Sequence, residues 1–538
     1  MTLSRTRRLA GMLAAVLALA ALSAGVHWGV MVAGGSDSYG YVSQAGLWRQ
    51  GSLVVQEDVI GRSPWPLAAA TWTPLGYRPA PGRSDAIVPM YAPGLPLLMA
   101  FFQTFGGFCG AFLVVPLSGA LTVWLTYALG RRVFDGPGIA LWGAALVATS
   151  PVFLYQLMNA MSDVPVTAAW TLALLLAVMR RPIAAGLAMS ATIAIRPNLA
   201  PLALVLLGWS ALVEWRDRGG RAAVVSALGL ATGMAPGIVG IAWLNATLYG
   251  SPWTSGYGTT ADLYSLRFGA ANLRHYAVWM GDVETPAVAL AALYFMAPRW
   301  FPPARIARAR LLLGGAMACV IASYVFYRPF DVWWYLRFLL PMWPVMMLLT
   351  AAALEAIARR SMRAAYPVAI ATMAGLLAWH GLSVAANRSV FDLGRGERRY
   401  VDVARFIDSH TPPDAVILSV QHSGSLRIYA GRLTLKYDVL DPVWLDRTVD
   451  YLQSVGRRPY FVLDGGEVDA FRQRFGVLNR TGALDWPPLA TLGSIVAVYD
   501  PIDRRPGSSP LAIARTRAPR GKALCDPPHS WPPLLRMK

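Results

Sequence analysis

The stretch LAGMLAAVLALAALSAGVHWGVMV, residues 9–32, decides the class of the fold. It is an apolar run preceded by Arg5, Arg7 and Arg8, and roughly 20 such residues are enough for a helix to cross a bilayer. A cleaved signal peptide is the alternative, because Ala21-Leu22-Ser23-Ala24 imitates a cleavage site. The apolar run continues past that site, so we expect an uncleaved first transmembrane helix.

The composition of the whole chain also indicates a membrane protein. Its 538 residues are 55% hydrophobic and only 14% charged, whereas soluble domains usually carry about 25% charged residues. The formal net charge of +19 could suggest a nucleic-acid-binding protein. The basic residues, however, are scattered between apolar runs rather than gathered on one domain, so we predict no nucleic-acid partner.

Ten further apolar runs follow the first, which predicts about eleven transmembrane helices. The loops between the runs alternate, and the short ones, such as the loop with Arg131 and Arg132, are basic. The positive-inside rule then places the N-terminus in the cytoplasm, and the long loops and the C-terminal region outside. The ten runs cover residues 110–129, 138–155, 164–179, 183–195, 199–213, 222–244, 287–300, 311–327, 339–357 and 365–384.

The chain divides into three regions where the apolar character ends. Residues 1–385 are predicted to form an all-α polytopic membrane domain, with a large first outer loop at 34–108. Residues 386–500 alternate strand and helix patterns, which predict a small soluble α/β domain without a catalytic motif. Residues 501–538 are rich in Pro and Arg, which predicts a disordered tail.

Two short features complete the organisation. The apolar segment 94–108 is short for a span, so it is either a re-entrant or interfacial helix or part of one long kinked helix with the next run. The cysteines Cys109, Cys319 and Cys525 lie far apart and form no CxxC pair. The sequence therefore supports neither a zinc site nor a disulfide framework.

The segment Gly34-Gly35-Ser36-Asp37-Ser38-Tyr39-Gly40-Tyr41 follows the first apolar run almost directly. A charge at the edge of a membrane is costly to bury and is often functional, so Asp37 is a candidate reactive carboxylate. Tyr41, Ala45 and Trp48 then recur at helical spacing, which predicts a helix along the membrane surface that begins near Asp37. The structural alternative is that Asp37 only caps this helix.

A series of short segments, in this order, resembles the GT-C class of integral membrane glycosyltransferases. The bacterial subgroup related to protein O-mannosyltransferases and aminoarabinose transferases is the most similar one, over about the first 385 residues. The segments are Asp37-Ser38-Tyr39, Tyr91-Ala92-Pro93-Gly94-Leu95-Pro96, Ser162-Asp163-Val164-Pro165, Ile195-Arg196-Pro197-Asn198, Tyr249-Gly250-Ser251-Pro252 with Gly256-Tyr257-Gly258, and Trp333-Trp334-Tyr335-Leu336-Arg337-Phe338-Leu339-Leu340-Pro341.

This resemblance implies an activity and roles for the two acids. Such enzymes take a sugar from a polyprenyl-phosphate carrier and work on the non-cytoplasmic face, here of a bacterial inner membrane, with inversion at the anomeric carbon. Asp37 is the candidate base that takes the acceptor proton, and Asp163 is a second acid of the cavity. A helix start at Ser162-Asp163-Val164-Pro165 is the alternative for Asp163. Which acid is the base, and whether both share a divalent cation, stays open.

The arginines near the outer ends of spans are candidates for the donor phosphate, because cations must steady the leaving phosphate. Arg196 has the alternative of snorkelling to the interface. Arg328 and Arg337 flank an aromatic segment on the face where positive charge is disfavoured, with Tyr335 as a candidate hydrogen-bond donor. Three further tyrosines are expected to contact substrate: Tyr41, Tyr91 and Tyr257.

The predicted partners are a polyprenyl-phosphate-sugar donor, membrane lipids, and a glycolipid, cell-wall polymer or protein as acceptor. No cofactor is certain. A polytopic secondary transporter or lipid flippase is the competing hypothesis, because about eleven spans would serve either activity. Transporters usually show internal repeats and polar residues at mid-membrane. Here no repeat is apparent and the acids gather at the outer interface, which favours catalysis on one face.

Overall fold

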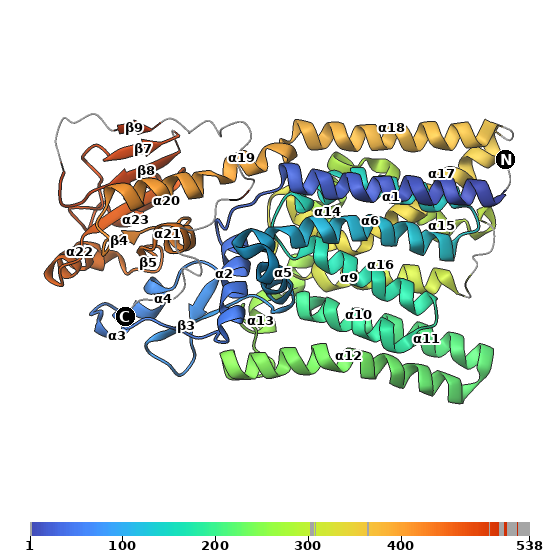
Figure 1. Cartoon of the computed structure of the whole chain (residues 1–538), viewed down its shortest axis with the longest axis horizontal. Helices are drawn as coiled ribbons and strands as arrows, with labels where there is room; N and C mark the ends of the chain where they lie inside the picture. Colours follow the sequence, from blue (N-terminus) through green and yellow to red (C-terminus); the bar gives the residue numbers. More distant parts are fainter. Residues whose placement is uncertain are drawn as a thin grey trace.

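The structure is a computed structural model that describes residues 3–301, 306, 308–362, 365–493, 495–504, 511–513 and 525. Figure 1 shows two parts end to end: a bundle of long helices lying side by side, and a smaller part with strands and helices at one end of the bundle. The predicted fold class is therefore confirmed: an all-α polytopic membrane protein with a small C-terminal α/β domain.

The helices of the bundle form where the sequence has its apolar runs. Among the described residues, six helices are long and apolar enough to cross a membrane, or seven if the bent pair α7 and α8 is one span. The count of about eleven therefore stays a prediction. The bundle helices are α1 (Leu3–Trp28), α6 (Val114–Val133), α7 (Pro137–Thr149), α8 (Pro151–Leu157), α9 (Asp163–Val178), α10 (Pro182–Ile195), α11 (Leu202–Arg218), α12 (Gly220–Tyr249), α15 (Leu293–Met296), α16 (Ala309–Val325), α17 (Trp343–Met362) and α18 (Tyr366–Asn387).

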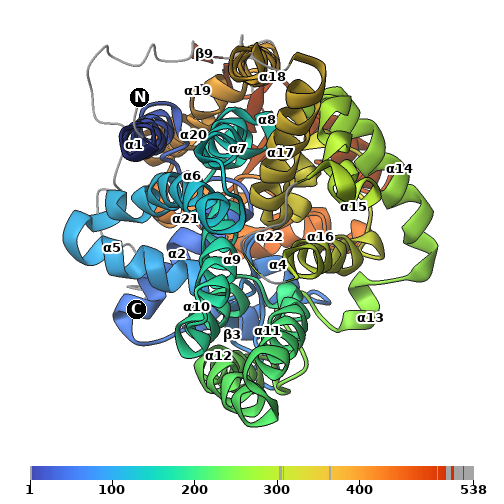
Figure 2. The same cartoon turned by 90° about the vertical axis from the view of Figure 1, so that its right-hand side faces the viewer.

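The bundle has a buried centre and a lipid-facing rim. The most apolar stretch within Trp333–Met362, which comprises α17 and the 3-10 segment before it, is 94% buried. The most apolar stretches of α12 and α18 are each only 22% buried. Figure 2, which looks along the bundle, accordingly places α1, α12 and α18 on the outside. Apolar side chains on these outer helices, such as Val239 and Trp243 of α12, are exposed. A helix that is apolar all round suits a membrane environment.

The first outer loop folds into a compact layer across one end of the bundle (Figure 1). Its three strands form an antiparallel sheet in the order β1-β3-β2. The elements of this layer are α2 (Asp37–Gln50), β1 (Val55–Gln56), α3 (Val59–Arg62), α4 (Ala68–Trp72), β2 (Tyr77–Pro79), β3 (Ala86–Pro89) and α5 (Gly94–Gly110).

Helix α2 begins at Asp37, as the sequence predicts, but it does not lie on an open membrane surface. Every residue from Ser38 to Leu47 is buried. The C-terminal part covers this helix, since a Cβ on Gly424 would lie 2.2 Å from the ring of Tyr39. The helix lies across the end of the bundle (Figure 1), but it is covered rather than exposed, because the covering surface comes from a distant part of the chain.

Helix α5 combines both expectations for the segment 94–108. It lies crosswise to the bundle (Figure 2), which fits an interfacial helix. It also continues toward α6 through a break at Gly107, whose φ of 57° suits glycine.

The C-terminal part is a six-stranded mixed sheet with helices, in the strand order β5-β4-β6-β8-β7-β9. Strands β4 and β6 are buried along their whole length, as expected for central strands covered on both faces. The elements are α19 (Leu393–Glu397), α20 (Arg399–His410), β4 (Val416–Leu418), α21 (Ser423–Ala430), β5 (Leu433–Leu435), α22 (Leu445–Ser454), β6 (Pro459–Asp464), α23 (Glu467–Phe475), β7 (Ala490–Leu492), β8 (Val496–Tyr499) and β9 (Leu511–Ile513).

The described pieces of the tail 501–538 are tied to the fold. Strand β9 pairs in parallel with β7, and Cys525 forms a disulfide with Cys109 at the end of α5. The inference against a disulfide was therefore wrong, because residues 416 apart in the sequence meet only in the folded chain. The rest of the segment predicted to be disordered lies outside the described residues.

A buried arginine fastens the C-terminal part to the first outer loop. Arg427 of α21 pairs with Glu57 and donates through Nη2 to the backbone oxygen of Trp72 at 2.6 Å. It also donates through Nε to Thr434 Oγ1 at 2.8 Å and through Nη2 to Thr434 O at 3.2 Å. The C-terminal part is thereby tied to the first outer loop.

Candidate active site

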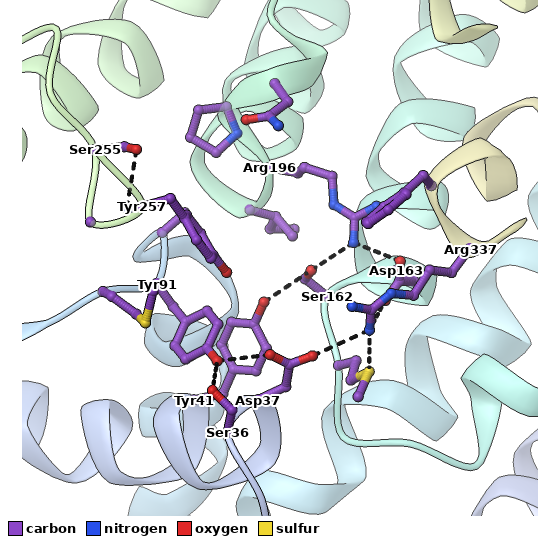
Figure 3. A pocket seen from close by; sticks show the side chains of 18 of the residues that line it. Ser36, Asp37, Tyr41, Tyr91, Ser162, Asp163, Arg196, Ser255, Tyr257 and Arg337 are labelled. Atoms are coloured by element: carbon purple, nitrogen blue, oxygen red, sulfur yellow. Dashed lines mark hydrogen bonds and ion pairs between the residues drawn. The ribbon is translucent and has the colours of Figure 1, made fainter. Parts of the chain in front are cut away.

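A cavity of about 530 Å³ lies where the bundle meets the first outer loop and the C-terminal part. Figure 3 shows its polar centre, where acids, arginines and tyrosines from different elements point toward one another. Eight of the residues predicted from the sequence line it, namely Asp37, Tyr41, Tyr91, Asp163, Arg196, Tyr257, Tyr335 and Arg337.

Asp37 is the more accessible of the two acids. Its Oδ1 accepts a hydrogen bond from the hydroxyl of Tyr91 at 2.7 Å, and its Oδ2 lies 3.2 Å from Nη1 of Arg337. Its side chain is 27% exposed. Both partners are side chains outside α2, so the carboxylate does not serve as a cap of this helix. It sits at the edge of the cavity with lone pairs still available.

Asp163 is enclosed. It begins α9 and its side chain is only 1% exposed. Its Oδ1 accepts from Nη2 of Arg196 at 2.6 Å, and its Oδ2 is 3.9 Å from Nη1 of Arg337. A buried charge is tolerated when it is paired and hydrogen-bonded. Asp163 therefore holds both guanidinium groups in place, and Arg337 is shared between the two carboxylates.

The two arginines keep part of their hydrogen-bonding capacity free. Arg196 caps the end of α10, and its Nη2 also donates to Ser162 Oγ at 3.0 Å. Every hydrogen bond and ion pair of Arg337 uses Nη1, so its Nε and Nη2 have no partner in the described part of the chain. The guanidinium carbon of Arg337 lies 5.0 Å from the centre of the Tyr335 ring. Arg337 is thus oriented but not saturated.

Tyrosine side chains surround the acids. The Tyr41 hydroxyl donates to Ser162 Oγ at 3.2 Å, and the ring centres of Tyr41 and Tyr91 are 4.4 Å apart. The ring of Tyr257 approaches Tyr91 edge-on at 5.8 Å. These rings form one wall beside the Asp37 carboxylate, as Figure 3 shows.

Arg328 is the predicted site residue that the structure leaves outside the cavity. Its side chain is exposed, and its backbone N–H donates to Leu263 O at 2.9 Å. Its neighbours Tyr327 and Phe330 line the cavity, as Arg337 does, but Arg328 itself does not. The structure therefore does not bring Arg328 together with the other predicted phosphate-binding residues, since its side chain points outward while those of its neighbours reach the cavity.

Several residues of the cavity were not assigned from the sequence. Ser36 Oγ lies 2.8 Å from the Tyr91 hydroxyl, and Ser162 bonds both Tyr41 and Arg196. Each serine directly precedes an acid in a quoted motif, so its position was a usable signal. Leu393 and Glu397 line the cavity from beyond the last membrane helix, and no local pattern marks them.

The acids of the site face arginines. Among the described residues, no group of three or more His, Cys, Asp and Glu side chains is placed to hold a metal ion. The positive charge beside Asp37 and Asp163 comes from Arg337 and Arg196.

Comparisons with known proteins establish what this fold resembles. No family model and no curated protein matches the sequence. ArnT from Cupriavidus metallidurans bound to undecaprenyl phosphate is 12% identical, with a TM-score of 0.56 over 93% of this chain and 99% of that chain. Its apo state is 13% identical, with a TM-score of 0.55 over the same shares. The arabinofuranosyltransferase AftD from mycobacteria is 14% identical, with a TM-score of 0.42 over 79% of this chain and 35% of that one.

At such low identity the likeness to ArnT concerns the fold alone. It extends over nearly the whole of both chains and so includes the bundle, the first outer loop and the C-terminal part. The fold of this protein is therefore the one seen in ArnT, over nearly the whole of the chain.

Proposed function

We propose that the protein is a glycosyltransferase that moves a sugar from a polyprenyl-phosphate-linked donor to an acceptor on the non-cytoplasmic face of the membrane. One observation carries the proposal. In the cavity, the partly exposed carboxylate of Asp37 lies 3.2 Å from the guanidinium of Arg337, whose Nη2 and Nε have no partner in the described chain. A base and a cation are thus side by side, as transfer from a phosphate requires.

The transfer proceeds in one displacement. The oxygen of an acceptor hydroxyl attacks the anomeric carbon, and the bond between that carbon and the phosphate oxygen breaks. The electron pair of this bond leaves with the polyprenyl phosphate, and Asp37 takes the proton of the acceptor. Attack opposite to the leaving group inverts the anomeric centre. Asp37 suits the base role better than Asp163, whose carboxylate is enclosed between two arginines.

The leaving phosphate is stabilised by the arginines. Arg337 presents free N–H groups, and a guanidinium can bind two phosphate oxygens at once. Arg196 adds a second positive charge, oriented by Asp163 at 2.6 Å. The aromatic wall of Tyr41, Tyr91 and Tyr257 offers flat apolar faces for the sugar ring. Undecaprenyl phosphate is the lipid bound to ArnT, and it is our proposed carrier here.

The disulfide supports the outward placement of the cavity. Cys109 and Cys525 belong to α5 and the tail, and disulfides persist in oxidising compartments outside the cytoplasm. In spheroplasts of a Cys319→Ala variant, mild reduction should let a membrane-impermeant PEG-maleimide label both cysteines. Labelling only after permeabilisation would place this end of the bundle in the cytoplasm and contradict the orientation.

A transfer assay tests the function. Purified protein in liposomes is given undecaprenyl phosphate carrying a radiolabelled hexose or pentose, together with an extract of bacterial envelope as acceptor. We expect label to move to the extract with the wild type and not with Asp37→Asn. Asp85→Asn is the matched control, because Asp85 is an exposed acid of the same loop outside the cavity. Label that crosses the liposome membrane without transfer would establish a transporter or flippase instead.

A further inference from the structure

The short helix α19 contributes to the wall of the cavity. It follows the last membrane helix, α18, and leads into α20 of the C-terminal part (Figure 1). Leu393 and Glu397 of α19 both line the cavity. They are four residues apart and therefore lie on one face of the helix. This face is turned toward the same space as Asp37.

The start of α20 is packed against the segment that carries Asp37. A Cβ on Gly34 would lie 2.1 Å from Cδ2 of Tyr400, so only glycine fits at this contact. The backbone N–H of Ala33 also donates to the hydroxyl of Tyr429 at 2.9 Å. The junction of α19 and α20 is therefore held in a definite position beside the candidate base.

Only one of the two carboxylate oxygens of Glu397 is hydrogen-bonded within the described chain. Its Oε1 accepts from Nη1 of Arg399 at 3.1 Å, and Nε of Arg399 is held by Asp464 Oδ2 at 3.0 Å. Within the described chain, Oε2 of Glu397 has no hydrogen-bond partner. The side chain is 29% exposed, so this oxygen remains accessible.

Glu397 differs from the other two acids of the cavity in its surroundings. Asp37 and Asp163 are both paired with the arginines that face the proposed phosphate site. Glu397 pairs instead with Arg399, which belongs to the C-terminal part and does not line the cavity. A second negative group such as phosphate would be repelled by a carboxylate, whereas a hydroxyl can donate to it.

We propose that Glu397 is a substrate-binding residue that accepts a hydrogen bond from a sugar hydroxyl through Oε2. The inference rests on the proposed function and assigns a second role to the cavity: arginines bind the phosphate, and α19 binds the saccharide. The hydroxyl belongs either to the sugar of the donor or to a saccharide acceptor, and the two arms of the experiment separate these sources. The C-terminal part thereby supplies a wall of the substrate site.

The first arm measures binding to the purified full-length protein. The probes are undecaprenyl phosphate alone and undecaprenyl phosphate carrying the hexose or pentose that the wild type binds best. If the hydroxyl belongs to the sugar of the donor, Glu397→Ala should weaken the binding of the sugar-bearing lipid about tenfold. This is the typical effect of losing a hydrogen bond to a charged group. Glu397→Gln should lose less affinity, because its amide oxygen can still accept a hydrogen bond. Affinity for bare undecaprenyl phosphate should stay within about twofold of the wild type.

The second arm measures transfer at saturating donor while the envelope extract is varied. For a saccharide acceptor, Glu397→Ala should raise the KM for the extract about tenfold and leave the KM for the donor unchanged. Asp392→Asn is the matched control in both arms, because Asp392 lies beside α19, pairs with the exposed Arg395 and does not line the cavity.

The outcomes separate this inference from the proposed function. Unchanged affinities and KM values in Glu397→Ala would overturn the role of Glu397 while leaving the glycosyltransferase intact. An equal loss of affinity for bare and sugar-bearing lipid would also overturn it, since it would indicate a purely structural role. A wild type that binds none of the lipids and transfers no sugar would refute the proposed function itself.

Discussion

Two arginine–carboxylate pairs in this protein have the same chemistry and different surroundings. Arg427 pairs with Glu57 between the C-terminal part and the first outer loop, and all three of its guanidinium nitrogens donate to protein oxygens. Arg337 pairs with Asp37 in the cavity, and only its Nη1 is engaged within the described chain. The Glu57 side chain is 4% exposed and that of Asp37 is 27% exposed.

This difference in hydrogen bonding distinguishes a structural ion pair from a candidate binding site. A buried ion pair is stable only when the remaining donors and acceptors are satisfied, and Arg427 meets this condition entirely within the protein. Arg337 does not, and its unpaired N–H groups lie beside a cavity. Incomplete hydrogen bonding of an oriented charge is therefore the feature on which we base the candidate site, and five experiments test this difference between the two pairs.

The largest effect is expected for Asp37→Asn. Loss of the proposed base should lower the kcat for sugar transfer by about 10² to 10⁴-fold, while thermal stability stays close to that of the wild type. Radiolabel transfer and a melting curve on the same sample measure both. Asp163→Asn should lower stability as well, since it leaves Arg196 without its charge partner. Transfer at the wild-type rate by Asp37→Asn would exclude Asp37 as the base.

Removing the Arg427–Glu57 ion pair should affect the stability of the protein rather than its binding of lipid. Arg427→Met leaves the Glu57 carboxylate buried without a partner, at a cost of about 3–5 kcal/mol. Thermal unfolding followed by tryptophan fluorescence measures the loss. Adding Glu57→Gln should restore part of the stability by removing the unpaired charge. The Kd for undecaprenyl phosphate should be unchanged in the folded fraction, and a large change there would mean that the two pairs are not separable.

Arg337→Ala should affect binding rather than stability. Loss of charge-assisted hydrogen bonds to phosphate should raise the Kd for undecaprenyl phosphate by about 10 to 100-fold. The Kd of Arg337→Lys should lie between those of the wild type and Arg337→Ala, because an ammonium group keeps the charge and loses the bidentate geometry. Arg328→Ala is the control, since Arg328 lies outside the cavity. Equal losses in Arg328→Ala and Arg337→Ala would indicate a general charge effect.

A smaller effect on stability is expected when the pH is lowered. It concerns a third polar cluster, formed by His422, Asp464 and Arg399 in the C-terminal part. Burial lowers the pKa of His422, against the influence of the Asp464 carboxylate. Burial opposes the shift at Asp464, but His422 and Arg399 lower the pKa of that carboxyl. The unfolded chain then binds the histidine proton first, so stability should fall as the pH drops below about 6.5. Melting temperatures of the wild type and His422→Gln across pH 8 to 5 measure this, and parallel curves would contradict it.

The smallest effect is expected from chelation. Because guanidinium groups supply the positive charge beside Asp37 and Asp163, we propose that transfer does not depend on a divalent cation. EDTA should change the rate of radiolabel transfer by less than about twofold. A rate abolished by EDTA and restored by Mg²⁺ or Mn²⁺ would instead assign a shared cation to the two carboxylates.

Many of the residues that line the cavity could be named from the sequence because they occupy characteristic local positions. Asp37 and Asp163 each begin a helix directly after a membrane segment or a short outer loop, and Arg196 directly follows a membrane helix. These positions depend on neighbouring residues only. Glu397 could not be found in this way, because its helix is polar and short and is distant in the chain from both acids and both arginines of the cavity.

The membrane class and the starts of the helices that carry Asp37 and Asp163 follow from the sequence alone, because apolar runs and helix starts are set by residues close together in the chain. The tertiary structure alone decided that Cys109 meets Cys525, that α2 is covered, and that Arg337 faces the cavity while Arg328 does not. These outcomes depend on contacts between distant segments, whose geometry is fixed only when the bundle and the C-terminal part pack together. The free N–H groups of Arg337 are a product of that packing, and they are the reason why we propose the cavity as the binding site.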